Sequence, residues 1–266
     1  MRVIITPQRA SELLERNAKN RPLDKKHIAR LAKTIEEGKW VWNGQTITVD
    51  ENGDVLDGQH RLYACIKANL PIDTEFLEGV PRNTFMTVGH VKRRTAADLM
   101  AMMQIPWWVE KTGLARHLFY YRIYDYHVKK IANALYEPQD IVEFYLKNRE
   151  EIDFTVDHMK MYKKSRIVVC FSKLLFIDCL CGKIDKEQTK AFIDKIVYGY
   201  DLEKGSPILA LRQTIINENT YIFYRTSNVI ILDLLFRCWN LYRQNESVEL
   251  NSLKLNYKAE RLPKLI

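Results

Sequence analysis

Hydrophobic positions near the start of the chain switch between helical and strand spacing. Residues 25–37 place apolar side chains every three or four positions, as one face of a helix does, and Asp24 is a candidate cap. Residues 46–49 are all β-branched and predict a strand, and the Asn52-Gly53 pair predicts a two-residue hairpin turn. Residues 72–77, Ile-Asp-Thr-Glu-Phe-Leu, predict another strand. We therefore expect a small mixed α+β domain here.

Strand spacing gives way to helical spacing after Pro81. The segments that we expect to be helical are 94–104, 106 onward, 138–148, 165–182, 185–198, 209–217 and 227–243. Residues 221–229 include β-favouring side chains, but the apolar spacing from Ser227 onward favours a helix. We predict an α+β fold, with a small mixed domain over residues 1–104 and an all-helical domain over residues 105–266.

One short stretch, Asp57-Gly58-Gln59-His60-Arg61, joins a predicted strand to a predicted helix. A helix start presents unpaired N–H groups and the positive end of the helix dipole, and Gly58 lets the backbone approach a ligand closely. Arg61 offers a planar set of donors suited to phosphate oxygens, and His60 donates one or two hydrogen bonds. The pattern predicts a phosphate cradle formed by Gly58, Gln59, His60 and Arg61.

Each charged side chain of this stretch also has a structural interpretation. Asp57 either contacts Mg²⁺ carried by a nucleotide, acts as an acid or base, or forms an Asx turn that shapes the loop. His60 either contacts phosphate or packs locally, and Arg61 either contacts phosphate or pairs with a neighbouring acid. Both interpretations stay open at this point.

The motif and the residues before it resemble the ParB/sulfiredoxin superfamily, in the Asp-Gly-Gln-His-Arg form common in phage and mobile-element proteins. The order that carries the resemblance is Arg21-Pro22-Leu23, a helix over 25–37, Gly38-Lys39-Trp40, Asn43-Gly44, a strand over 45–50, and then the motif. It covers about residues 1–100. Sulfiredoxins carry a catalytic cysteine where Gln59 stands, so their sulfinic acid repair is excluded here on chemistry.

The resemblance implies a ParB/sulfiredoxin-like domain that binds a nucleoside triphosphate with Mg²⁺ at Gly58–Arg61. It makes Asp57 a candidate metal contact and Asp57 and His60 the candidate catalytic residues for hydrolysis or phosphoryl transfer. ParB itself binds and hydrolyses CTP with a Glu-Arg-Arg version of the motif. A free-serine kinase branch has an Asp-Gly-His-His-Arg form, which is closer to this chain.

The 266-residue chain carries a net charge of +8, which suits a polyanionic partner such as DNA but also an ordinary basic protein. Two basic clusters are candidates for contact with nucleic acid or phosphate, and ordinary solvation is the alternative for both. These clusters are Lys92, Arg93 and Arg94, and Lys163, Lys164 and Arg166.

The cysteines and the apolar runs indicate the cellular compartment of the protein. Cys170, Cys179 and Cys181 lie in one apolar stretch, which suits reduced core thiols rather than a metal-thiolate site. The longest apolar runs are far shorter than a membrane span, and the first residues do not form a signal peptide. We expect a cytoplasmic protein without a membrane partner, and the oligomeric state stays open.

Three functions are compatible with these residues. The first is a nucleotide-binding, DNA-associated protein of phage or mobile-element type that hydrolyses a nucleoside triphosphate at the motif. The second is a kinase or nucleotidyl-transfer enzyme that acts on a small molecule or a modified base. The third is a non-catalytic interaction module with a vestigial motif. The sequence does not decide whether the protein is an enzyme.

Overall fold

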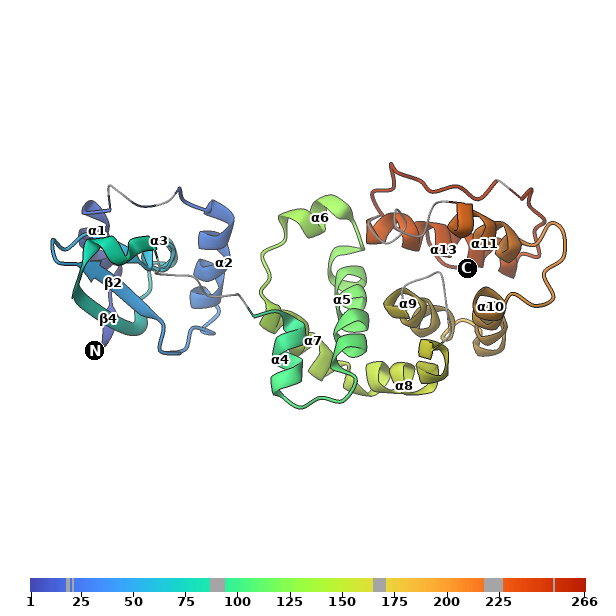
Figure 1. The fold of residues 1–266 in the computed structure, drawn as a ribbon, viewed down its shortest axis with the longest axis horizontal. Helices are drawn as coiled ribbons and strands as arrows, with labels where there is room; N and C mark the ends of the chain where they lie inside the picture. The colour runs from blue at the N-terminus through green and yellow to red at the C-terminus, as the bar shows by residue number, and fades with distance from the viewer. Residues whose placement is uncertain (18–19, 21, 87–93, 165–170, 218–226, 251) are drawn as a thin grey trace. The chain divides into compact units, whose positions relative to one another are not determined.

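The computed structural model describes the chain except for residues 18–19, 21, 87–93, 165–170, 218–226 and 251. It divides into two compact units (Figure 1). The N-terminal unit comprises Met1–Arg93 together with Leu135–Glu137, and the helical unit comprises Arg94–Ala134 and Pro138–Ile266. The first unit contains a four-stranded sheet, so the chain is mixed α+β. The sequence pattern placed the division slightly later, between residues 104 and 105.

The sheet of the N-terminal unit has the order β1-β4-β2-β3, and it is mixed because β2 and β4 run parallel while the other pairs are antiparallel. Its strands are β1 (Arg2–Ile5), β2 (Thr46–Asp50), β3 (Val55–Asp57) and β4 (Ile72–Val80). The sequence pattern did not predict β1. With four residues and a single buried side chain, Ile5, this strand is too short to show a clear alternation, and it is held by pairing with the distant β4.

Three helices accompany the sheet, and their starts follow from local sequence. In α1 (Pro7–Glu15) the Thr6 hydroxyl accepts the N–H of Arg9, and in α2 (Lys25–Glu36) the Asp24 carboxylate accepts the N–H of His27 at 2.9 Å. The cap at Asp24 confirms the prediction from the sequence. The third helix, α3 (Gln59–Ala68), packs against α1 and α2. The core lies between these helices and the sheet, where Ile47 and Leu62 are fully buried.

The hairpin between β2 and β3 has a three-residue loop, which corrects the two-residue turn expected from Asn52-Gly53. The N–H of Asp50 donates to the carbonyl of Asp54 at 2.9 Å, so residues 51–53 form the loop. Gly53 takes the left-handed conformation, with φ +81°. The Asp50 carboxylate accepts the N–H groups of Asn52 and Asp54, and this side-chain cap favours the longer turn.

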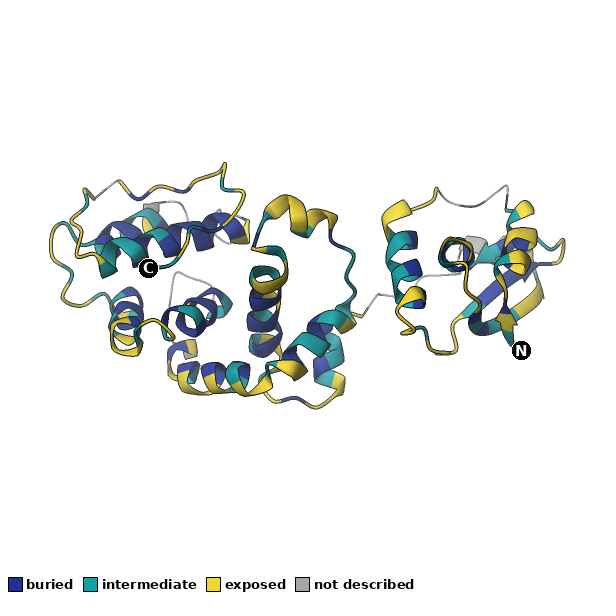
Figure 2. Ribbon diagram, turned by 180° about the vertical axis from the view of Figure 1, so that it is seen from behind, coloured by how far each residue is buried: buried dark blue, intermediate teal, exposed yellow. Residues whose placement is uncertain are grey.

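The helical unit contains no strand in its described residues. Its helices are α4 (Ala96–Met102), α5 (Trp108–Tyr124), α6 (Val128–Asn133), α7 (Pro138–Lys147), α8 (Arg149–Met159), α9 (Phe171–Cys181), α10 (Lys186–Tyr198), α11 (Pro207–Asn217) and α13 (Asn228–Arg243). Helix α5 packs against α4, α6, α7, α8 and α9, while α13 packs against α9, α10 and α11. Figure 2 shows α13 as almost continuously buried. Helices α6 and α8 were not predicted, and residues 221–226 lie outside the described part.

The core of the helical unit is aromatic. Phe176, Phe236, Phe192 and Trp239 are fully buried, and the Phe176 and Phe236 rings stack with centroids 6.0 Å apart. The cysteines Cys65, Cys179, Cys181 and Cys238 are buried and free, whereas Cys170 lies outside the described residues. Burial raises the pKa of the Cys65 thiol to about 11, so it is an unreactive core thiol as expected. Among the described helices, none has the length and apolar character that crossing a bilayer requires.

Candidate functional site

Glycine is required at the point where β3 turns into α3. Gly58 has φ +98° and ψ 3°, a left-handed conformation that residues with a Cβ rarely adopt. A Cβ at this position would lie 2.9 Å from Cγ1 and 3.3 Å from Cα of Ile47 on the neighbouring strand. Both the backbone conformation and the available space therefore demand Gly58, which brings the motif close against the sheet.

Asp57 and Arg61 bracket this turn and bind each other. One carboxylate oxygen of Asp57 accepts the N–H of Gly58 at 2.7 Å, and the other accepts Nη2 of Arg61 at 3.1 Å. The same Nη2 donates to the carbonyl of Thr46 at 2.9 Å. The structural interpretations of both residues are thus realised: Asp57 shapes the loop, and Arg61 pairs with a neighbouring acid.

The Arg61 guanidinium is nevertheless incompletely paired. Its side chain is 11% exposed, whereas that of Asp57 is 40% exposed. Nη1 of Arg61 is buried and has no hydrogen-bond partner among the described residues. Burial lowers the pKa of Arg61 from its ordinary value, and the Asp57 carboxylate opposes that shift only in part. The group remains charged at neutral pH, so the junction holds a poorly solvated cation that an anion would stabilise.

Gln59 and His60 point into the protein rather than toward solvent, with only 3% and 6% of each residue exposed. Nδ2 of Asn17 donates to Oε1 of Gln59 at 3.1 Å. The N–H of Asp24 donates to Nε2 of His60 at 3.0 Å, and the ring of His27 lies 5.4 Å away between centroids. Because Nε2 accepts this bond, it carries no proton to donate to a phosphate. In this arrangement the two side chains anchor α3 to the segment before α2.

The predicted basic clusters are only partly visible. Lys92, Arg93 and Arg166 lie outside the described residues, as does the side chain of Lys164. Arg94 is exposed and precedes the Thr95 cap of α4. Nζ of Lys163 pairs with Glu110 at 2.6 Å and lies 4.5 Å from the ring centroid of Trp107. Lys163 is therefore already engaged within the helical unit.

The residues at the junction do not fit a metal site held by the protein. Among the described residues, no three His, Cys, Asp or Glu side chains gather closely enough to hold an ion. Asp57 stands alone as a carboxylate in the motif, and both of its oxygens already accept hydrogen bonds.

Some residues that shape the junction could not be recognised from sequence. The carbonyl of Thr46, the side chain of Ile47 and the amide of Asn17 reach the motif through contacts between distant positions, which leave no local pattern. A second group of residues missed from sequence lines a cavity in the helical unit, and one of them is Asp178 of α9. A signal existed there, because Asp178 is an isolated acid within an otherwise strongly apolar helix.

No protein-family model, curated protein or solved structure matches this chain. The assignment of function therefore depends on the geometry of the β3–α3 junction and on the motif that builds it.

Proposed function

We propose that the N-terminal unit is a ParB/sulfiredoxin-like domain that binds the phosphates of a nucleotide at the β3–α3 junction, with Arg61 as the anion anchor. The observation that carries this proposal is the buried Nη1 of Arg61, which finds no hydrogen-bond partner in the part of the chain that the structure describes. A left-handed Gly58 at the start of α3 supports it, because the helix dipole there favours negative charge.

The geometry indicates how a phosphate would reach the guanidinium. Nη1 is enclosed by the chain, so the contacts of Arg61 must change on binding. Asp57 is the partner that can give way, because its side chain is 40% exposed and its bond to Arg61 is 3.1 Å long. A phosphate that replaces the Asp57 carboxylate would bring more charge and a second acceptor oxygen to the same guanidinium.

Binding is better supported than turnover. A general base must lie within hydrogen-bond reach of the proton it removes. His60 is buried and its Nε2 accepts a backbone N–H, while both oxygens of Asp57 are engaged. Hydrolysis or phosphoryl transfer by these residues would need the same rearrangement that exposes Arg61. We therefore propose nucleotide binding as the main function, and we regard NTPase, kinase or nucleotidyl-transfer activity as less well supported.

Calorimetric titration with ATP, CTP, GTP and UTP, each with and without Mg²⁺, tests the proposal. At least one nucleotide should bind. The Arg61→Lys variant should bind that nucleotide about tenfold or more weakly, because lysine lacks the planar pair of N–H donors of a guanidinium. Arg9→Lys is the matched control. Arg9 lies on α1 of the same unit, with a side chain 52% exposed, and pairs with Glu12. Equal binding by the Arg61→Lys and Arg9→Lys variants would contradict the proposed anchor.

A non-catalytic interaction module is the second candidate, and the closed junction favours it. Gln59 and His60 are buried in contacts that anchor α3, and Asp57 and Arg61 pair with each other. In that case the motif serves only the fold. No heat with any nucleotide, combined with a lower melting temperature of the Arg61→Lys variant, would select this candidate over the first.

Association with DNA forms part of the first proposal. It is supported by the net charge of +8 and by the exposed Arg94, which continues the basic run that begins at Lys92. A protein that neutralises phosphates in this way loses affinity steeply with added salt.

A further inference from the structure

The helical unit contains a cavity of about 360 Å³, bounded by α8, α9, α10 and the short 3-10 helix η2 (Lys160–Lys164). Its apolar lining includes Phe154, Met159, Met161 and Ile193. Phe154 and Met161 are 60% and 63% exposed, so the described residues do not cover this apolar surface. A cavity of this size with an apolar wall is typical of small-molecule sites.

A buried carboxylate lies in the same cavity. Asp178 of α9 is 8% exposed, and its Oδ1 lies 3.4 Å from Nε2 of His158 on α8. Among the described residues, His158 is its only ion-pair partner. Burial raises the pKa of Asp178 to about 6 despite the opposing effects of His158 and Lys186. The contacts with His158 and Lys186 therefore do not replace the solvation that this carboxylate has lost.

Two lysines at the cavity are already neutralised. Lys183 pairs with Glu151, and Nζ of Lys190 pairs with Asp194 at 2.6 Å. An anionic ligand would have to break one of these pairs before it could bind either ammonium group.

The remaining charges around the cavity are mostly acidic. Nζ of Lys186 lies 5.8 Å from the ring centroid of Phe154 and is the third lysine in the lining. Glu150 and Glu187 also line the cavity, and neither makes an ion pair with any residue that the structure describes. With Asp178 these are three acids, against Lys186 and the His158 ring that pairs with Asp178, so acids still predominate and the cavity favours a positively charged ligand.

We propose that this cavity binds a small molecule that carries an ammonium group on an apolar body. The ammonium group lies against the Asp178 carboxylate and supplies the missing counter-charge. The apolar body packs against Phe154 and Met161, where it covers surface that is otherwise exposed to water.

Three probes with the same phenyl-ethyl skeleton test this proposal on the full chain. Calorimetric titration near neutral pH should show that 2-phenylethylamine binds about tenfold or more tightly than 2-phenylethanol, since only the amine pairs with Asp178. Phenylacetate, which has the opposite charge, should bind more weakly than the alcohol. Equal or tighter binding of phenylacetate would overturn the proposal, as would failure of all three probes to bind.

Two variants locate the site. Asp178→Asn should reduce the affinity for the amine about tenfold, to that of the alcohol, and leave the alcohol unchanged. Asp157→Asn is the matched control, because Asp157 lies on α8 with a side chain 59% exposed, pairs with Lys160 and does not line the cavity. Phe154→Ala changes an exposed side chain and should weaken the amine and the alcohol alike.

The fold of each variant is checked by circular dichroism and thermal melting. If Asp178→Asn folds and still binds the amine as the unaltered chain does, the proposal is wrong. If Asp178→Asn does not fold, Phe154→Ala decides, and unchanged binding of the amine by that variant would overturn the assignment.

Discussion

At the scale of single residues, Gly58 determines whether the motif can form. Its φ of +98° strains any residue with a Cβ, and such a Cβ would come within 2.9 Å of Ile47. Ile47 is fully buried in the core and has little room to move. We expect Gly58→Ala to lower the free energy of unfolding of the N-terminal unit by about 2–3 kcal/mol, from strain and overpacking together. Urea denaturation measures this loss.

Gly44→Ala separates the two causes. Gly44 also has a positive φ, +75°, but a Cβ there would meet nothing within 4 Å. This variant should lose only the strain contribution, about 1 kcal/mol. If both variants are equally destabilised, close contact with Ile47 is not what requires glycine at position 58.

Asp57 lets the binding proposal be tested at the same scale. If phosphate and the Asp57 carboxylate compete for Arg61, Asp57→Asn should bind the nucleotide more tightly, by about threefold to tenfold. Loss of the carboxylate leaves the buried Arg61 guanidinium with less counter-charge, so stability should fall by about 1–2 kcal/mol, less than for a fully buried pair because Asp57 is partly exposed. Calorimetry and urea denaturation measure the two effects. Weaker nucleotide binding by this variant would instead indicate that Asp57 contacts the ligand or its Mg²⁺.

At the scale of elements, Glu151 connects three parts of the helical unit. Arg122 of α5 donates to both of its oxygens, at 2.7 and 2.8 Å, and the Cys179 thiol of α9 lies 3.2 Å away. Burial by itself would raise the pKa of Glu151, but hydrogen bonds from Arg122, Lys183 and Cys179 outweigh it and lower the pKa to about 2. The ionised carboxylate therefore stabilises the packing of α5, α8 and α9.

The sign of the pH dependence follows from that lowered pKa. The contribution of Glu151 is complete above its ordinary pKa of 4.5 and is lost as the pH falls from there toward about 2. Glu151→Gln should lower the free energy of unfolding by about 1–2 kcal/mol at pH 7, after screening is allowed for, and by less near pH 3. Urea denaturation at both pH values measures it. The exposed Glu150 shares none of these contacts, so Glu150→Gln should have almost no effect at either pH.

Most elements could be predicted from sequence because their signals are local. Asp24 lies where a carboxylate precedes an apolar period, and the structure confirms it as a cap. Thr6 and Thr95 cap α1 and α4 by the same local rule. The Asn52-Gly53 pair by itself indicates a loop one residue too short, because the Asp50 side chain accepts N–H groups across the turn and favours the longer loop. Strand β1 was missed because it depends on pairing with β4 far along the chain.

The candidate site could be predicted only in part. Residues 57–61 do lie together at a strand–helix junction, as the motif indicates. The spacing gave no sign that Gln59 and His60 would be buried by Asn17 and Asp24, because these contacts span about forty residues of sequence. The incomplete pairing of Arg61 likewise depends on tertiary packing and is visible only in the structure.

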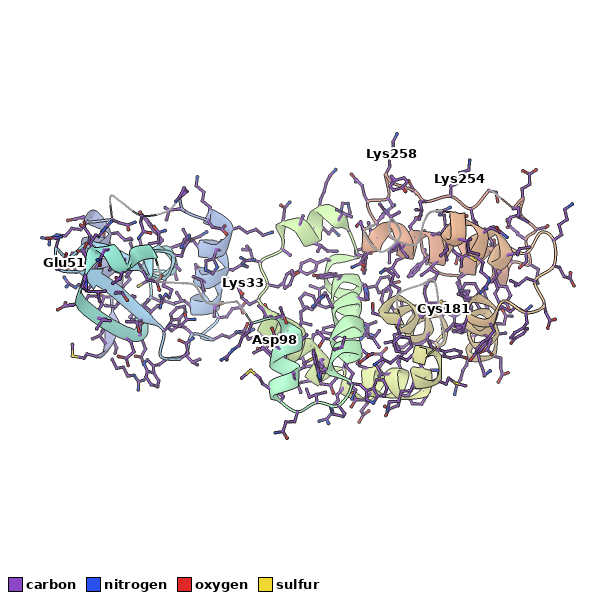
Figure 3. The ribbon with its side chains drawn as sticks, viewed as in Figure 1. Lys33, Glu51, Asp98, Cys181, Lys254 and Lys258 are labelled. Atoms are coloured by element: carbon purple, nitrogen blue, oxygen red, sulfur yellow. The ribbon has the colours of Figure 1, made fainter. Side chains whose placement is uncertain are left out.

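At the scale of the whole molecule, net charge leads to a prediction about DNA. If the run Lys92-Arg93-Arg94 contacts phosphates, replacing all three by alanine should weaken DNA binding about tenfold or more and reduce the salt slope by about 2–3. Fluorescence anisotropy with a labelled duplex across a salt series measures both quantities. Lys254, Lys258 and Lys264 are exposed in the C-terminal segment, and Figure 3 shows the first two projecting outward. Replacing these three lysines by alanine removes the same charge and should change DNA affinity little. An equal loss of affinity in both variants would exclude a specific role for Lys92-Arg93-Arg94.

Because each of the two units has its own core, we expect two unfolding transitions. Trp40 and Trp42 belong to the N-terminal unit, whereas Trp107, Trp108 and the fully buried Trp239 belong to the helical unit. Phenylalanine replacements that leave tryptophan in only one unit make fluorescence a reporter of that unit. In these two backgrounds, Gly58→Ala should lower the urea midpoint reported by Trp40 and Trp42 and leave the other midpoint unchanged.

The reason is that the atoms displaced by a Cβ at position 58 belong to Ile47, in the core between the sheet and its three helices. The aromatic core around Phe176 and Trp239 has no part in that contact, so its free energy of unfolding should not respond. A common shift of both midpoints would show that the two cores unfold together. In that case the change at the motif would act on the whole chain, and stability could not be assigned to either unit alone.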